Sequence, residues 1–332
     1  MKGHDRTATR RVRIGIMGCA EFARRRMAPA ITEHPDIELT AVASRAPETA
    51  AATATRFACE PVTGYAELLE RDDVDAVYVP LPVALIGDWA LRALRAGKHV
   101  LAEKSVACAV SRARELTTCA AERGLVLLPN FLFLRHVQQR AVAKLVAAGE
   151  LGELRLISAA FGFPPRPSGD IRYRRDLGGG SLAETGIYPV RLAQSLLGDG
   201  LRVGHAVLRE AAGPTGAFDV AGAAQLYDEA GVVAQLAFGF DHSYRCDYEI
   251  WGSKGRVRVE RAFTPPADWE PVVWWERDGG RERLPLAPDD HVRNLLTEFC
   301  ARVRGERAAG AEPAAVVETA RLLEEISAKA TG

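Results

Sequence analysis

The sequence lacks a charge imbalance, because its 43 lysines and arginines equal its 43 aspartates and glutamates. A chain without net charge has no long-range attraction to nucleic acid or to a membrane surface, so neither partner is predicted. An apolar run long enough to cross a bilayer is also missing. The pair Arg10–Arg11 is followed by a strand-like pattern and glycine, with no apolar signal core, so we predict no export signal. We expect a cytoplasmic protein.

Closely spaced metal ligands and paired cysteines are missing as well. No two of the six cysteines form a C-x-x-C pair, and the seven histidines show no H-E-x-x-H spacing. This pattern argues against a disulfide framework and against a zinc site, and we expect no metal. The cysteines are Cys19, Cys59, Cys108, Cys119, Cys246 and Cys300.

The chain is long and apolar enough for two domains, with 332 residues of which 48% are hydrophobic. Up to residue 130, apolar strands alternate with helical segments, which predicts an α/β domain with a doubly wound parallel sheet. Strands such as 74–82, VDAVYVPLP, are almost continuously apolar, as expected when helices cover both faces of a sheet. The predicted strands are 12–18, 37–44, 74–82, 99–105 and 125–130; the predicted helices are 21–31, 47–57, 65–70, 88–97 and 111–124.

The alternation of strands and helices ends after a predicted helix at 136–149. Six strand-like segments follow without helices between them, which predicts an α+β domain with a mostly antiparallel sheet. Two helices, at 289–304 and 313–330, end the chain. We therefore predict domains over residues 1–130 and 131–332. The strand-like segments are 154–163, 201–210, 217–228, 231–240, 244–253 and 255–263.

A turn that suits a dinucleotide follows the first strand. In GCAEFA, residues 18–23, a glycine turn leads from a strand into a helix, whose N-terminus would bind a pyrophosphate. Ala20 stands where the G-x-G-x-x-G pattern has its second glycine, so the motif alone is weak and its βαβ context carries the prediction. The predicted cofactor residues here are Gly18, Cys19, Ala20, Glu21 and Phe22.

The end of the second strand indicates which dinucleotide binds. An NAD-binding domain usually has an acidic residue near this point, which holds the ribose 2′-hydroxyl. This chain has Ser44 and Arg45 instead, and a guanidinium suits a 2′-phosphate. We therefore predict NADP(H) as the cofactor.

The stretch GGGSLAETGIYPVRLA, residues 178–193, combines three glycines with a helix that carries Glu184 and Tyr188. Residues four apart share one helix face, so the carboxylate and the phenol point the same way. Tyr188 is then either a core tyrosine or a proton donor. Pro189 removes one helical hydrogen bond beside it and predicts a kink.

Several motifs in order decide between these readings. HVLAEKSVA at 99–107, PLP at 80–82, the glycine stretch, GSKGR at 252–256 and DHVRNLLTEF at 290–299 together resemble the glucose–fructose oxidoreductase/inositol dehydrogenase (Gfo/Idh/MocA) family over nearly the whole chain. Within it, the chain is most similar to ketoreductases that act at C-3 of dTDP-linked keto-deoxysugars. EKS at 103–105 replaces the usual EKP.

The resemblance implies a Rossmann domain and a second domain whose open sheet often forms an oligomer interface, so we expect a homodimer or homotetramer. It places Lys104 beside the nicotinamide and aligns Glu184 and Tyr188 with substrate-binding and catalytic positions. Tyrosine at this position is typical of a subset that includes the glucose–fructose and dihydrodiol enzymes. Further cofactor residues expected at strand ends are Pro80, Leu81, Glu103, Lys104 and Asn130.

Ketone reduction gives Lys104 and Tyr188 complementary roles. The carbonyl carbon takes a hydride and its oxygen takes a proton. A phenol is a weak acid, with a pKa of about 10, and a nearby ammonium would lower that pKa. We therefore predict that Tyr188 donates the proton while Lys104 assists it and steadies the developing alkoxide.

The substrate prediction depends on two departures from relatives. Val83 and Ile86 replace polar residues after PLP, which gives an apolar wall that suits a deoxygenated sugar. The arginines of RYRRD are either a surface face or a clamp for a diphosphate. The predicted substrate-binding residues are Phe161, Arg172, Tyr173, Arg174, Glu184, Tyr188 and Tyr244; Phe163 and Arg175 are further candidates.

We thus predict NADPH-dependent reduction of a keto group on a dTDP-linked keto-deoxysugar, in deoxysugar and antibiotic biosynthesis. One alternative is an NADP-dependent dehydrogenase of a free sugar, an inositol or a dihydrodiol. A second alternative, from another class, is a non-catalytic NADP-binding regulator.

Overall fold

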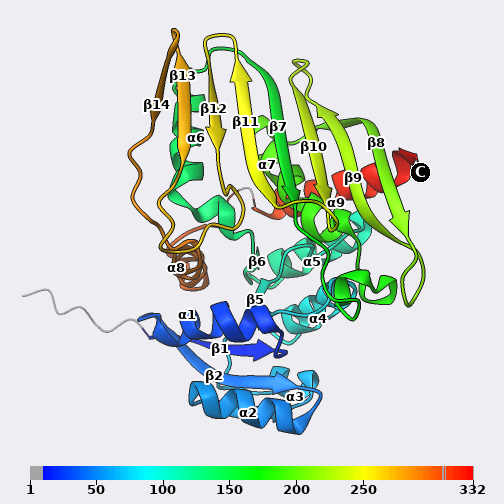
Figure 1. Ribbon diagram of the computed structural model, residues 1–332. Helices are drawn as coiled ribbons and strands as arrows, with labels where there is room; N and C mark the ends of the chain where they lie inside the picture. The colour runs from blue at the N-terminus through cyan, green and yellow to red at the C-terminus, as the bar shows by residue number, and fades with distance from the viewer. Residues whose placement is uncertain (1–9, 309, 311, 332) are drawn as a thin grey trace, which may run out of the picture.

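Six parallel strands form the sheet of the N-terminal half (Figure 1). The structure, a computed structural model, describes residues 10–308, 310 and 312–331. The strand order reverses between β1 and β4, which creates the crevice where doubly wound sheets bind ligands. The predicted parallel sheet is thus confirmed. In spatial order the strands are β3 (Glu60–Thr63), β2 (Ile37–Ser44), β1 (Val12–Met17), β4 (Ala76–Val79), β5 (His99–Ala102) and β6 (Leu127–Pro129).

Helices cover both faces of this sheet, which explains why its strands are apolar on both sides. In β4, Val77 and Val79 belong to one core cluster and Ala76 and Tyr78 to the other. The first cluster is covered by α3 (Tyr65–Leu69), α4 (Val83–Arg95), α5 (Val110–Glu122) and α9 (Glu312–Lys329). The second is covered by η1 (Ala23–Met27), α1 (Ala28–Glu33), the end of α2 (Pro47–Phe57) and α8 (His291–Val303).

Nine strands form the second sheet, and most of them pair antiparallel. The pairs β7–β10 and β8–β15 are parallel, so the sheet is mixed. Its strands in order are β14 (Gly280–Arg283), β13 (Val273–Arg277), β12 (Gly255–Val259), β11 (Arg245–Gly252), β7 (Leu154–Gly162), β10 (Val233–Gly239), β9 (Phe218–Tyr227), β8 (Arg202–Ala211) and β15 (Ala330–Thr331). The prediction missed β13 and β14, because they carry charged and exposed residues at the sheet edge.

One face of the second sheet is open and the other is packed. The inner face packs on α6 (Val137–Ala147), α7 (Ile187–Leu197) and α9. In Figure 1 the strands lie in front of these helices. Short helical turns precede two helices of the second half: η2 (Leu132–Arg135) leads from β6 to α6, and η3 (Ile171–Tyr173), η4 (Arg175–Leu177) and η5 (Leu182–Gly186) lie between β7 and α7.

The division into residues 1–130 and 131–332 stays a prediction, and residues 1–9 of its first part lie outside the described residues. The helices α8 and α9 belong to the second part by sequence, yet both pack on the first sheet. The two halves therefore share cores. Among the residues that the structure describes, no helix combines the length and the apolar character needed to cross a membrane.

Candidate active site

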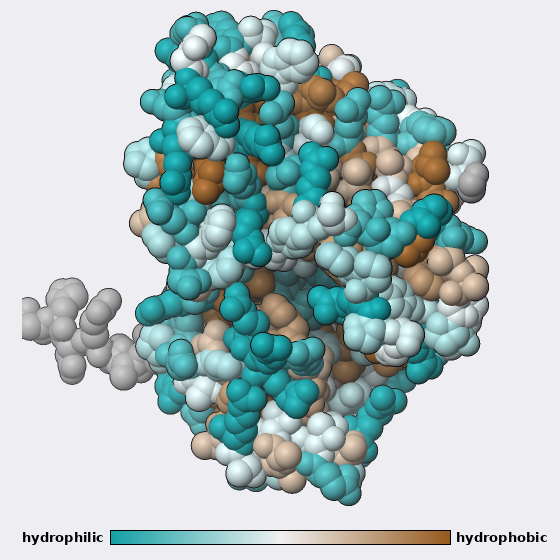
Figure 2. All heavy atoms as spheres, viewed as in Figure 1, coloured by the Kyte–Doolittle hydropathy of each residue, from teal (hydrophilic) through white to brown (hydrophobic). Residues whose placement is uncertain are grey.

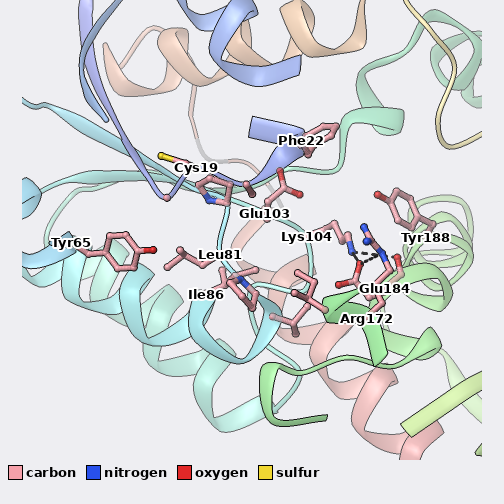
Figure 3. Close-up of a pocket in the computed structure, with 16 residues that line it drawn as sticks. Cys19, Phe22, Tyr65, Leu81, Ile86, Glu103, Lys104, Arg172, Glu184 and Tyr188 are labelled. Carbon is pink, nitrogen blue, oxygen red and sulfur yellow. Dashed lines mark hydrogen bonds and ion pairs between the residues drawn. The ribbon is translucent and has the colours of Figure 1, made fainter. Parts of the chain in front are cut away.

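A cavity of about 370 Å³ lies where the strands of the first sheet end, facing the second half of the chain (Figure 3). The space-filling view shows the surface hollowed between the two halves (Figure 2). Turns after β1, β4 and β5 supply one wall, and segments near η3 and η5 supply the other. The lining residues are Gly18, Cys19, Ala20, Phe22, Tyr65, Pro80, Leu81, Pro82, Val83, Ile86, Glu103, Lys104, Ile171, Arg172, Glu184 and Tyr188.

The turn after β1 has the shape that a pyrophosphate needs. Gly18 has a φ of +111°, which L-residues with a side chain rarely adopt, and a methyl group there would meet Leu81. Cys19, Ala20 and Phe22 also line the cavity. Glu21 is exposed and pairs with Arg25 at 2.8 Å instead. The residues that line this turn therefore fit a dinucleotide, and Glu21 lies outside the lining of the cavity.

Ser44 ends β2 and Arg45 follows it, and neither residue is among those that line the cavity. The buried Ser44 hydroxyl accepts a hydrogen bond from the Ala46 backbone N–H, so it shapes the turn. Arg45 is exposed and lies close to the hydroxyl of Tyr65. Burial raises the pKa of Tyr65, although Arg45 opposes this. Tyr65 lines the end of the cavity far from Tyr188 (Figure 3), and no motif in the sequence marks it as a site residue.

Glu103 is a partly buried carboxylate with two short hydrogen bonds. The hydroxyl of Tyr78 and the side-chain amide of Asn130 both donate to its Oε1 at 2.5 Å. Burial raises the pKa of Glu103, and these donors only partly offset it. Asn130 lies behind Glu103, where it lines a smaller cavity of about 90 Å³ together with Tyr188 and His291. The sequence analysis did not predict Tyr78 as a site residue, because it lies within an apolar strand and its position is typical of a core residue.

Lys104, Glu184 and Arg172 form a charged cluster in the cavity wall (Figure 3). Lys104 Nζ lies 2.5 Å from Glu184 Oε2 and 3.3 Å from the Glu184 backbone oxygen. Arg172 Nε lies 3.6 Å from the same carboxylate, and the guanidinium also binds Asp170 at 3.1 Å. Burial alone would raise the pKa of Glu184, but Lys104 and Arg172 together hold it below its usual value. Glu184 is therefore an ionised carboxylate.

Tyr188 presents its hydroxyl to the cavity and packs its ring into the core. Its ring centroid lies 5.1 Å from that of Phe161 and 5.8 Å from that of Phe263. Lys104 Nζ lies over the ring, 5.9 Å from its centroid. Burial raises the pKa of Tyr188 well above its usual value, and the carboxylates of Glu103 and Glu184 raise it further. The predicted lowering of this pKa by Lys104 is wrong, because the ammonium is paired with Glu184.

Proline and a widened helical turn explain the local shape around Tyr188. The turn η5 is a π-helical turn, in which the Ile187 N–H bonds to the carbonyl of Leu182, five residues earlier. Pro189 has no N–H, so it cannot donate to the carbonyl of Glu184 in the same register. Lys104 binds that carbonyl instead. The helix that carries Pro189 thus begins with a π turn, which leaves the Glu184 carbonyl as an acceptor for Lys104.

The three glycines allow close approach of backbone to backbone. Side chains at Gly178 and Gly179 would overlap with the Ala84 N–H and the Arg172 carbonyl. One at Gly180 would overlap with Asp219, which accepts from the Ser181 hydroxyl at 2.7 Å. Because they have no side chains, the glycines allow the segment that carries Glu184 and Tyr188 to lie close to α4. Because α4 begins at Val83, earlier than predicted, Val83 and Ile86 line the cavity.

Several predicted substrate residues lie outside this cavity. Phe161 is buried against the ring of Tyr188 and does not line the cavity. The Tyr173 hydroxyl accepts from the Arg166 backbone, and Arg174 pairs with Asp176 at 2.6 Å. Tyr244 is exposed, with its hydroxyl 3.3 Å from that of Thr264. Of the arginines in RYRRD, only Arg172 lines the cavity, which narrows the predicted diphosphate clamp to one residue.

A metal has no built site in the part of the chain that the structure describes. No group of three or more histidine, cysteine, aspartate or glutamate side chains there is arranged to hold one. Glu103 and Glu184 are instead engaged by hydrogen-bond donors and cations of the protein. The side chains of this cavity that carry a charge or an acidic proton include an ammonium, a guanidinium, two carboxylates and a phenol.

Comparisons with known proteins agree with this geometry. Residues 12–131 match the oxidoreductase family with an NAD-binding Rossmann fold, and residues 139–258 match the GFO/IDH/MocA C-terminal domain. The chain is 48% identical over 293 residues to a dTDP-3,4-didehydro-2,6-dideoxy-alpha-D-glucose 3-reductase of Saccharopolyspora spinosa, covering 88% of each chain. It is 49% identical over 303 residues to the enzyme of that description from Streptomyces violaceoruber, covering 91% of this chain and 88% of that one.

A solved structure of similar fold carries ligands. A 3-ketoreductase from Actinomadura kijaniata, in complex with NADP and TDP-benzene, matches with a TM-score of 0.92 and 44% identity. The match covers 96% of this chain and 98% of that one.

The charged cluster predicts a pH-dependent stability. Lys104→Met removes the ammonium, and the pKa of Glu184 should rise because burial then outweighs the remaining attraction of Arg172. In the wild type the folded pKa of Glu184 is depressed, so the stabilisation is present above the unfolded pKa and is lost as the pH falls through the folded value. We expect Lys104→Met to lower the free energy of unfolding by up to about 3 kcal/mol at pH 7, and by less below about pH 5.

Urea unfolding at several pH values measures this difference. The control is Arg95→Met, which breaks the exposed pair of Arg95 with Glu115, whose side chains are 59% and 43% exposed. Its loss should stay below about 1 kcal/mol at every pH. A Lys104→Met difference that does not change with pH would contradict the assignment of an ionised Glu184.

Proposed function

The chain belongs to the GFO/IDH/MocA oxidoreductase family, and we propose that it is an NADPH-dependent reductase of the C-3 keto group of a dTDP-linked keto-deoxysugar. The observation that carries the proposal is the cluster of Lys104, Glu184 and Arg172 beside the hydroxyl of Tyr188, at the strand ends of a dinucleotide-binding sheet. Identity near one half to 3-reductases over most of the chain supports the same substrate class.

The chain's own residues suit the two halves of a ketone reduction. Bound NADPH supplies the hydride for the carbonyl carbon. The turn from Gly18 to Phe22 would hold its pyrophosphate, and Arg45 its 2′-phosphate. Glu103 is fixed by Tyr78 and Asn130 at the end of β5, where it gives this end of the cavity a rigid wall.

Tyr188 donates the proton to the carbonyl oxygen of the substrate in this proposal. Its raised pKa keeps the phenol protonated, which is the form that a proton donor requires. The Lys104 ammonium, which Glu184 holds in place, steadies the negative charge that develops on the substrate oxygen. Proton transfer then occurs only as that oxygen becomes basic enough to take it.

The cavity wall supports a deoxygenated sugar. Val83 and Ile86, from the first turns of α4, offer no hydrogen-bonding groups to a hydroxyl. A hydroxyl facing them would lose its bonds to water without replacement. The polar groups of the sugar, including its keto group, would then bind to the charged cluster on the opposite wall.

We expect Tyr188→Phe to lower kcat about 100-fold or more, which is the usual contribution of general acid catalysis, with little change in KM. Steady-state NADPH oxidation measures both constants. Tyr227→Phe, which removes a hydroxyl at the end of β9, is the matched control. A near-wild-type rate for Tyr188→Phe would mean that water or a substrate hydroxyl supplies the proton.

Arg45→Ala should weaken NADPH binding by about 1–3 kcal/mol and leave NADH binding nearly unchanged, because only NADPH carries the 2′-phosphate. Fluorescence titration of each cofactor measures the two affinities. Arg56→Ala removes an exposed charge from α2 and should change neither. Equal losses for both cofactors would assign Arg45 a general rather than a selective role.

Whether the sugar must be linked to a nucleotide can be tested by comparing linked and free ketosugars as substrates. A nucleotide-linked ketosugar should have a kcat/KM at least ~100-fold above that of the free sugar, because charge-assisted bonds to a diphosphate are worth roughly 3 kcal/mol. Free dTDP should inhibit competitively against the sugar, and thymidine, which lacks the diphosphate, is the matched control. A screen of NADPH oxidation across linked and free ketosugars gives both results.

The alternatives correspond to other outcomes of that screen. Equal turnover of free sugars without inhibition by dTDP would favour a dehydrogenase of free sugars, inositols or dihydrodiols. No NADPH oxidation with any ketosugar would favour a non-catalytic regulator.

We also propose that copies of the chain associate through the open face of the second sheet, as a homodimer or homotetramer. A shallow hollow of about 450 Å³ on this face is lined by small side chains such as Ala160, Ala223 and Ala237. Val207 and Trp251 are exposed at 39% and 56%. Figure 2, from this side, shows apolar patches among polar residues. The mass in solution, relative to 35.9 kDa for one chain, decides the point.

The proposed setting is an antibiotic-sugar pathway in the cytoplasm. The described cysteines are all free, which fits a reducing compartment.

A further inference from the structure

Ser105, the residue after Lys104, has an unusual backbone conformation. Its φ is +63°, in the left-handed region that favours glycine. It lies in the turn between β5 and α5 and is only 2% exposed. A buried serine in this conformation persists only where its surroundings hold it there.

A hydrogen bond across the crevice holds it. The Ser105 hydroxyl donates to the backbone carbonyl of Ala183 at 2.5 Å. Ala183 lies in η5, the π-helical turn that also carries Glu184. Lys104 donates to the carboxylate and to the backbone carbonyl of Glu184. Two consecutive residues of the β5–α5 turn thus bind two consecutive residues of η5.

The left-handed conformation of Ser105 lets its hydroxyl reach the Ala183 carbonyl. Its bond fixes the distance between the two backbones independently of any charge. With that distance fixed, the Lys104 side chain reaches both oxygen acceptors of Glu184. A proline at 105, with φ held near −65°, could not adopt this turn and could not donate the bond to Ala183.

We propose that Ser105 is a positioning residue for Lys104: its left-handed conformation and its bond to Ala183 hold the ammonium on Glu184 and at the distance from Tyr188 that the reaction needs. Ser105 itself does not line the cavity. The inference rests on the proposed function for its kinetic consequence, but its geometric part concerns Lys104 and Glu184 alone.

Two substitutions separate the hydroxyl from the backbone conformation. Ser105→Gly keeps the left-handed conformation without strain and removes the hydroxyl, while Ser105→Ala removes the hydroxyl and retains the strain. We expect kcat to fall about tenfold for both variants, the scale of one lost hydrogen bond. The KM for NADPH should stay within about twofold of the wild type, since Ser105 is not predicted to touch the cofactor.

A second measurement needs no substrate. Limiting acetic anhydride acetylates free amines, and mass spectrometry quantifies the modification of Lys104 in the chain without ligands. Release of Lys104 from Glu184 should raise this modification several-fold in Ser105→Gly and Ser105→Ala. The matched control is Ser195→Ala, which removes a hydroxyl that donates to the Leu192 carbonyl at 2.7 Å on α7; it should change neither kcat nor Lys104 reactivity.

A double-mutant cycle assigns the effect to Lys104. In a Lys104→Ala background, Ser105→Ala should cause no further loss of kcat, because the group that it positions is gone. Wild-type kcat and wild-type Lys104 reactivity in the glycine and alanine variants would overturn the proposal. So would a kcat loss without increased Lys104 reactivity, or an additive loss in the double mutant. If no ketosugar is turned over even by the wild type, the proposed function fails, and Lys104 reactivity still tests the geometry.

Discussion

The ion pair between Lys104 and Glu184 is the interaction on which the site depends, because it joins the two halves of the chain at the reacting centre. Both side chains are largely buried, at 13% and 12% exposure, so neither charge would be stable there alone. Arg172 adds a second cation and Asp170 balances it. The result is a compact cluster with no free charge, in which each group fixes the next. The positions of Lys104 and Glu184 thus follow from mutual neutralisation across the crevice.

This pairing also decides the chemistry of Tyr188. An unpaired ammonium beside the phenol would favour the phenolate, whereas a paired one leaves burial and two nearby carboxylates to dominate. The phenol is therefore kept protonated at rest, and a proton can leave it only when a stronger base forms beside it. A developing alkoxide is such a base. In the proposed reaction, this arrangement would keep the proton on Tyr188 until the hydride step creates the alkoxide.

Two prolines follow the π turns that flank the cavity. Pro29 follows η1, and Pro189 follows η5. In each case the first turn of a helix beside the cavity is a π turn, which holds one residue more than an α-helical turn. A proline, which has no backbone N–H to donate, follows that turn. At Pro189 the consequence is visible, since Lys104 takes the carbonyl of Glu184 that a helical N–H would otherwise satisfy. The glycines from Gly178 to Gly180 complete this design, because they let η5 approach α4 and Asp219 without side chains between them.

The sequence by itself determined the two kinds of sheet, because apolar periodicity is a local property. It also predicted the turn for NADP and the roles of Lys104, Glu184 and Tyr188, because the motifs occur in a recognisable order. It could not determine where Phe161 or Tyr244 would lie, since alternation along a strand does not say which neighbour covers it. The bond from Tyr78 to Glu103, the inward turn of Arg172 and the left-handed Ser105 arise from contacts between residues 12 to 78 positions apart. Only the tertiary structure decided that Lys104 pairs with Glu184 and leaves Tyr188 a neutral phenol, because a pKa depends on burial and on every charge nearby, and folding alone sets both.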